Sequence, residues 1–232
     1  MTEAATLPAL LDALNRKERF WLLRQAIGEP FGSLSEDFLR AIEEQLGSDV
    51  MIPTDPWWAF DYHLDWIAVA LRLFGEGRSL SSEDRRPEPI PNVGAPTDGE
   101  TTGGPLVRGS QQDADLLIAY GRTLIVVEAK AGTSWSRSQM DGKVERLDEI
   151  RALADAAQVA MHLVLCSPAL SNVHVSSGKK GRVWPDWALD GDRARHVPLA
   201  FGERGKPLFH ARRTGKRGDR YETVEFVRTD RP

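Results

Sequence analysis

The sequence predicts an α/β fold, with a mixed central β-sheet flanked by helices and preceded by an N-terminal helical segment. Two apolar runs, 116–120 and 124–127, are joined across Gly-Arg and are typical of a β-hairpin. Apolar residues at helical spacing cover 138–157, and a further apolar run follows at 161–166. A strand, a helix and a strand in succession form a right-handed crossover between parallel strands, so the sheet should combine antiparallel and parallel pairs.

The first third of the chain predicts helices. Apolar residues between 7 and 27 recur at helical spacing up to a Gly-Glu-Pro stop signal at 28–30. A second helix is expected to start at Ser33 or Ser35, because Ser33 with Glu36 three residues later fits a capping box.

A third helix is expected from 57 to 74, because Pro56 is well placed near its start and a glycine follows its end. From 75 to 112 the chain is mainly Gly, Pro, Ser, Thr and charged residues without periodicity, which predicts a flexible loop. This loop would be either a mobile tether or a cover over a substrate. The predicted organisation is a helical segment at 1–56 and a second domain at 57–232.

Further strands are expected in the last part of the chain, at 196–201, 207–211 and 221–227. The last two flank a polar, basic turn at 212–220, and a second basic loop lies at 178–182. Both basic stretches are candidates for contacts with backbone phosphates, which give affinity without sequence reading. The alternative is that they are merely solvated.

The charge distribution bears on the partner. The chain has 232 residues and a net charge of -4, which argues against a wholly basic nucleic-acid wrapper but not against a local basic groove. Residues 1–60 contain ten Asp and Glu against five Lys and Arg, whereas 205–232 contain eight Lys and Arg against four Asp and Glu. This asymmetry points to an anionic partner at the basic end.

Cysteine content and hydropathy bear on location. Cys166 is the single cysteine, so no intrachain disulfide forms, and no Cys and His residues stand at zinc-binding spacing. The first residues lack the pattern of a signal peptide, and no apolar run approaches the about 20 residues of a membrane span. The sequence therefore predicts a cytoplasmic protein.

The ends of the predicted hairpin carry charges. Asp115 opens the first strand, and Glu128 and Lys130, two residues apart, close the second on one face. Such charges are unfavourable at the end of a buried strand unless they have a partner or a task. Two carboxylates and a lysine at one place suit a divalent metal ion that acts on phosphate. The alternative is a structural ion pair.

This arrangement resembles the PD-(D/E)XK nuclease superfamily, the fold of many restriction endonucleases and repair nucleases. The resemblance covers about 57–166 and rests on Asp115, Glu128, Lys130 and the hairpin between them. Ala114 stands where the family usually has proline.

The resemblance implies a nuclease that depends on Mg²⁺, or on Mn²⁺, and hydrolyses phosphodiester bonds, with DNA as the expected substrate. It implies that Asp115 and Glu128 bind the metal ion together with the backbone carbonyl of Ala129. Lys130 would then orient the attacking water or stabilise charge that develops on the phosphate.

Many members of the family add an acid from a helix before the hairpin. Asp61 matches that position, with Asp65 as the fallback; the alternative is an exposed acidic helix face. Gln139 and Lys143, near the start of the helix after the hairpin, resemble residues that contact substrate or water in several branches of the family. The alternative for them is a solvated first turn.

A second function remains open from the sequence: a catalytically inactive, nuclease-like interaction or regulatory module. The expected partners are nucleic acid, with a homodimer or a partner protein as further possibilities. DNA and RNA are not distinguished by the sequence.

Overall fold

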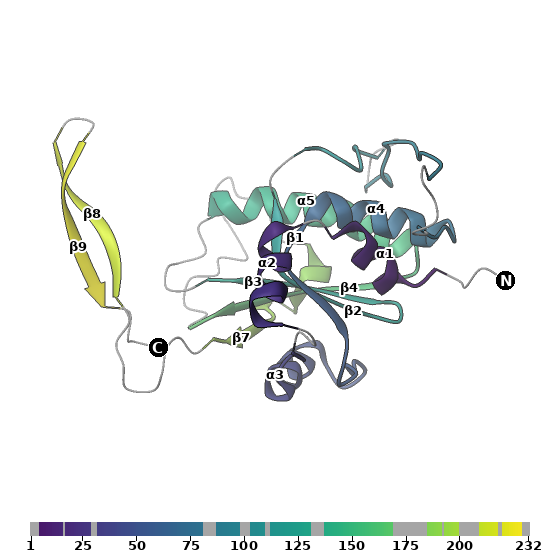
Figure 1. Ribbon diagram of the computed structural model, residues 1–232, viewed down its shortest axis with the longest axis horizontal. Helices are drawn as coiled ribbons and strands as arrows, with labels where there is room; N and C mark the ends of the chain where they lie inside the picture. Colours follow the sequence, from purple (N-terminus) through teal and green to yellow (C-terminus); the bar gives the residue numbers. More distant parts are fainter. Residues whose placement is uncertain are drawn as a thin grey trace.

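The computed structural model describes residues 5–15, 17–28, 32–80, 87–97, 103–109, 112–130, 137–168, 185–191, 193–199, 209–217 and 220–228. The chain is α/β, and its main sheet has five strands in the order β1-β2-β3-β4-β7 with helices on both faces (Figure 1). These strands are β1 (Trp57–His63), β2 (Asp113–Tyr120), β3 (Thr123–Ala129), β4 (Ala160–Ser167) and β7 (His196–Pro198). The predicted fold class is confirmed.

The predicted β-hairpin and the predicted strand–helix–strand crossover form the middle of this sheet. β2 and β3 are antiparallel, and Gly121 in their turn has a φ of 51°, a backbone conformation that glycine adopts without strain. β3 and β4 are parallel and are joined through α5 (Arg137–Ala156). The mixture of antiparallel and parallel pairs is therefore as predicted.

The predicted helix at 57–74 is wrong in its first seven residues, which form the edge strand β1 antiparallel to β2. This segment, Trp-Trp-Ala-Phe-Asp-Tyr-His, is rich in aromatic residues, which favour strands, and only the later residues keep a helical period. α4 (Leu64–Gly75) begins after His63, whose side chain accepts a hydrogen bond of 3.1 Å from the backbone N–H of Asp65. Asp61 and Asp65 therefore do not share a helix face.

The predicted N-terminal helices are present. The pattern between 7 and 27 is divided into α1 (Leu7–Leu14) and α2 (Glu18–Ile27). α3 (Glu36–Leu46) has Ser35 as its N-cap, which is one of the two predicted starts. Ser33 is not the cap, so the capping box predicted there does not form.

Each face of the sheet has its own apolar core. α1, α4 and α5 pack on one face, and α3 packs on the other. On β3 the residues alternate accordingly: Leu124 and Val126 face α4 and α5, and Ile125 and Val127 face α3. Glu128 continues the first series, so its carboxylate is directed to the helical layer of α4 and α5.

The last described part of the chain forms short elements and a hairpin. The short elements are η1 (Asp186–Ala188), β5 (Leu189–Asp190) and β6 (Arg193–Ala194), and the hairpin consists of β8 (Phe209–Arg217) and β9 (Arg220–Arg228). The basic turn predicted at 212–220 is mostly strand. β8 continues to Arg217, beyond the predicted strand end at 211, and β9 begins at Arg220. The basic loop at 178–182 lies outside the described residues.

No helix in the described part of the chain has the length and apolar character needed to cross a membrane.

Candidate functional site

The candidate site lies at the end of the β2–β3 hairpin. The antiparallel register pairs Leu116 with Val127, and its continuation by one residue places Asp115 opposite Glu128. The two acids that the sequence singled out are therefore cross-strand neighbours. Like charges in this relation destabilise a sheet unless a cation lies near them.

Glu128 is almost wholly buried, with 3% of its surface exposed. Its Oε2 lies 2.5 Å from the ammonium nitrogen of Lys143 on α5, whereas its buried Oε1 accepts no hydrogen bond from any described residue. Burial and, to a smaller extent, the Asp115 carboxylate raise the pKa of Glu128 to about 7, against the opposing effect of Lys143. Oε1 thus has no hydrogen-bond donor among the described residues and lies on the side of the Asp115 carboxylate.

Asp115 is held to the neighbouring strand by the backbone. Its Oδ2 accepts a hydrogen bond of 2.7 Å from the N–H of Ala129, the last residue of β3. Lys130 follows directly, is partly exposed, and donates its backbone N–H to the carbonyl of Cys166 over 2.8 Å. The hairpin therefore brings Asp115, Glu128, Ala129 and Lys130 to one end of the sheet.

Asp61 lies on β1, and the β1–β2 register places it opposite Asp115. Its φ of 54° is unusual for a residue other than glycine, and the regular pairing of the two strands is interrupted at this position. The carboxylate of Asp61 pairs with Arg19 over 3.0 Å. Asp61 thus reaches the sheet position beside the site from a strand rather than from a helix.

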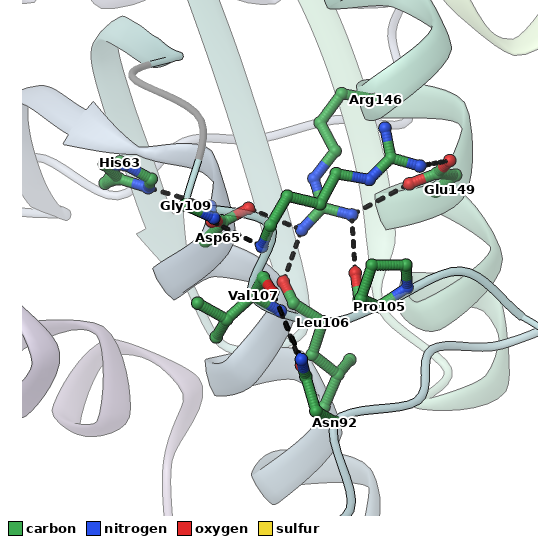
Figure 2. A network of polar contacts seen from close by, with 10 residues as sticks. His63, Asp65, Asn92, Pro105, Leu106, Val107, Gly109, Arg146 and Glu149 are labelled. Carbon is green, nitrogen blue, oxygen red and sulfur yellow. Dashed lines mark hydrogen bonds and ion pairs between the residues drawn. The ribbon is translucent and has the colours of Figure 1, made fainter.

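Asp65, the fallback acid, belongs to a different cluster, which Figure 2 shows at the layer of α4 and α5. Its Oδ1 lies 2.7 Å from Arg146 of α5, and its Oδ2 accepts the backbone N–H groups of Arg108 and Gly109 over 2.8 and 2.9 Å. With 1% of its surface exposed and both oxygens satisfied, Asp65 is a structural acid.

The same cluster anchors part of the predicted loop. Arg146 donates to the carbonyl groups of Pro105 and Leu106 and pairs with Glu149, and the side chain of Asn92 bonds to the backbone of Val107 (Figure 2). No helix or strand occurs in the described residues between α4 and β2, as predicted. The part at 103–109 is nevertheless fixed to both helices by hydrogen bonds that are buried or partly buried.

The structure places Lys143 in direct contact with the candidate site. The sequence placed it with Gln139 among candidates for contacts with substrate or water. In the structure its ammonium contacts Glu128 and also donates to the carbonyl of Asp113 over 2.9 Å. Asp113 in turn pairs with Lys17 over 2.6 Å. Gln139 lies in the first turns of α5, and its side chain is outside the described part of the structure.

The number of side-chain oxygen atoms at the candidate site limits which metal ions it could hold. Among the described residues, no three His, Cys, Asp or Glu side chains gather closely enough to hold a metal ion. Mg²⁺ usually takes only one or two protein carboxylates and fills its other positions with water and substrate phosphate. Asp115 and the free Oε1 of Glu128 meet that smaller requirement.

A scan against protein-family models and searches of curated proteins and of solved structures found no match for this chain.

Proposed function

We propose that this protein is a metal-dependent nuclease of the PD-(D/E)XK type, with DNA as the expected substrate and the cytoplasm as the expected location. One observation carries the proposal: Asp115 and Glu128 are cross-strand neighbours, and the buried Oε1 of Glu128 has no hydrogen-bond partner among the described residues. A buried oxygen of this kind needs an explanation, and a bound cation is one.

Asp115 and Glu128 would hold Mg²⁺ or Mn²⁺ together with the carbonyl of Ala129. When bound, the ion supplies polarisation of the scissile phosphate and a more acidic water. Lys130, at the partly exposed end of the strand, would stabilise the negative charge that develops on the phosphate. Asp115 is kept in position by the N–H of Ala129, which fixes one of its oxygens.

Lys143 has a positioning role in this proposal. Its contact with Oε2 directs Glu128 so that Oε1 is left for the ion, and its second bond, to the carbonyl of Asp113, ties α5 to the start of β2. Asp61 is assigned to the edge of the site, because its register position is beside Asp115 while its carboxylate pairs with Arg19.

The test is cleavage of labelled double-stranded DNA, single-stranded DNA and RNA with Mg²⁺ or Mn²⁺, followed over time. Glu128→Gln and Lys130→Ala should each reduce cleavage by at least a hundredfold while far-UV circular dichroism stays unchanged, because removal of one stabilising group in a reaction centre commonly costs this much. Glu44→Gln, an exposed acid of α3, is the matched control and should cleave like the wild type. Full activity of Lys130→Ala would contradict the role of Lys130.

The second candidate is an inactive, nuclease-like interaction module. It is favoured by the ion pair with Lys143, which already supplies Glu128 with a cation. Thermal unfolding with added Mg²⁺ or Mn²⁺ separates the two functions, because an ion that binds the folded state stabilises it by about 2.7 kcal/mol at a hundredfold excess over Kd. A rise in Tm that is lost in Glu128→Gln supports the metal site, and an unchanged Tm supports the inactive module.

A further inference from the structure

The β8–β9 hairpin differs from the rest of the fold. Among the described strands, β8 and β9 pair only with each other, and Figure 1 shows this ribbon apart from the five-stranded sheet. Thr214 and Thr223 face each other across the ribbon with hydroxyl oxygens 2.8 Å apart, and Phe226 is 72% exposed. Within the described residues the ribbon therefore has no packing partner in the five-stranded sheet.

The charge of the ribbon is opposite to that of the protein. Residues 209–228 contain six Lys and Arg against three Asp and Glu, whereas the whole chain has a net charge of -4. Five of the six basic residues lie between 212 and 220. The positive charge is thus concentrated toward the turn.

The register places like charges together at this end. Arg217 and Arg220 are cross-strand partners, and Lys216 is paired with Tyr221. Two arginines directly opposite each other destabilise a hairpin unless an anion lies between them. A phosphate or carboxylate bound at the end of the ribbon would relieve this repulsion.

Nucleic acid explains these features better than a lipid surface. Five of the six basic residues are arginine, whose guanidinium matches a phosphodiester in two hydrogen bonds. Two strands of nine residues span about 30 Å, and a two-stranded ribbon fits the major groove of B-form DNA.

We propose that the β8–β9 ribbon is a duplex-binding arm, which enters the major groove of DNA and grips the backbone through Arg213, Lys216, Arg217 and Arg220. This inference rests on the proposed function for the nature of the substrate, but it concerns binding and not cleavage. The acidic remainder of the chain explains why binding would need an arm.

The experiment is fluorescence anisotropy with a labelled 20-base-pair duplex and the single strand of the same length, at several salt concentrations without divalent metal. The fourfold variant Arg213→Gln/Lys216→Gln/Arg217→Gln/Arg220→Gln should bind the duplex at least tenfold more weakly. Its slope of log K against log salt should fall by up to about 3.6, at about 0.9 for each lost phosphate contact. Glu222→Gln/Glu225→Gln, a double variant of the same ribbon, should bind more tightly than the wild type.

The double variant decides the question if the fourfold variant fails to fold, because its affinity must rise if the ribbon contacts phosphates. Unchanged duplex affinity in both variants would overturn the arm, as would preference for the single strand. Binding to phosphatidylserine vesicles that depends on the ribbon, without duplex binding, would also overturn it.

Cleavage by the wild type is measured separately from binding. If duplex binding depends on the ribbon and no cleavage occurs, the nuclease proposal fails and the arm remains.

Discussion

Lys143 on α5 and Glu128 on β3 form an ion pair with 2.5 Å between the ammonium nitrogen and Oε2, although 15 residues separate them in the chain. The side chains are 18% and 4% exposed, so the pair is largely removed from water. Removal of one partner from such a pair leaves the other charge buried and uncompensated.

Lys143→Met should therefore destabilise the protein at pH 8 by about 3 kcal/mol, measured as the free energy of unfolding in urea. The double variant Lys143→Met/Glu128→Gln should recover a large part of this loss, because the buried charge is then absent. Arg40→Met is the control: Arg40 pairs with Asp37 on the surface of α3 and should change stability by less than about 1 kcal/mol. Additive effects of the two substitutions would contradict the pairing.

The cluster around Asp65 predicts a loss of stability rather than of chemistry. Asp65→Asn removes the buried carboxylate of Arg146, itself 1% exposed, and leaves only the partly exposed Glu149 beside the guanidinium, so it should cost about 3 kcal/mol in urea unfolding. Asp155→Asn, which breaks an exposed pair with Arg151, should cost less than about 1 kcal/mol. If Asp65→Asn abolishes the metal-induced rise in Tm of a fully folded protein, Asp65 belongs to the functional site after all.

The docking of the N-terminal helices can be tested at Leu11. Leu11 is wholly buried in the core that α1 shares with α4 and α5, and its carbonyl accepts the hydroxyl of Tyr62 over 2.8 Å. Leu11→Ala should cost about 2–5 kcal/mol, whereas Leu22→Ala, at a site 69% exposed on α2, should stay within about 0.5 kcal/mol. Equal effects of the two substitutions in urea unfolding would contradict this packing.

His162 on β4 predicts how stability depends on pH. Burial lowers the pKa of His162 from 6.5 to about 4, with smaller contributions from Arg195 and Arg151. The unfolded chain then binds a proton at higher pH than the folded protein does, so the contribution of His162 is present above pH 6.5 and is lost as the pH falls toward 4. His162→Gln should reduce the fall in urea midpoint between pH 7 and pH 4.5. An identical fall in variant and wild type would rule out His162 as its source.

Local sequence patterns were sufficient to predict the strands in the middle of the sheet and the helix that joins two of them. The apolar runs around Gly121 predicted the β2–β3 hairpin, since turn chemistry and alternation act over a few residues. The helical period predicted α5 to within a residue at each end, and the run after it predicted β4. The register of the hairpin then brings Asp115 and Glu128, which the sequence placed at the ends of its two strands, opposite each other.

The features that the sequence did not predict depend on contacts between segments that are distant in the chain. The residues of β1 were assigned to a helix although their aromatic side chains favour a strand, because the pairing with β2, some 50 residues later, is formed only in the fold. Asp65 looked like a functional acid because its partners at 108, 109 and 146 are brought to it only by the fold. Lys143 could be placed near the site by its helix, but its contact with Glu128 depends on how α5 lies across β3.

The ion pair between Asp65 and Arg146 also constrains the order in which the chain folds. It joins residues 81 positions apart, and it holds the segment at 103–109 against two helices that come together only once β2, β3 and α5 are in place. Because residues so far apart in the chain meet slowly, we expect this ion pair to form late in folding. Its loss should therefore accelerate unfolding far more than it slows folding.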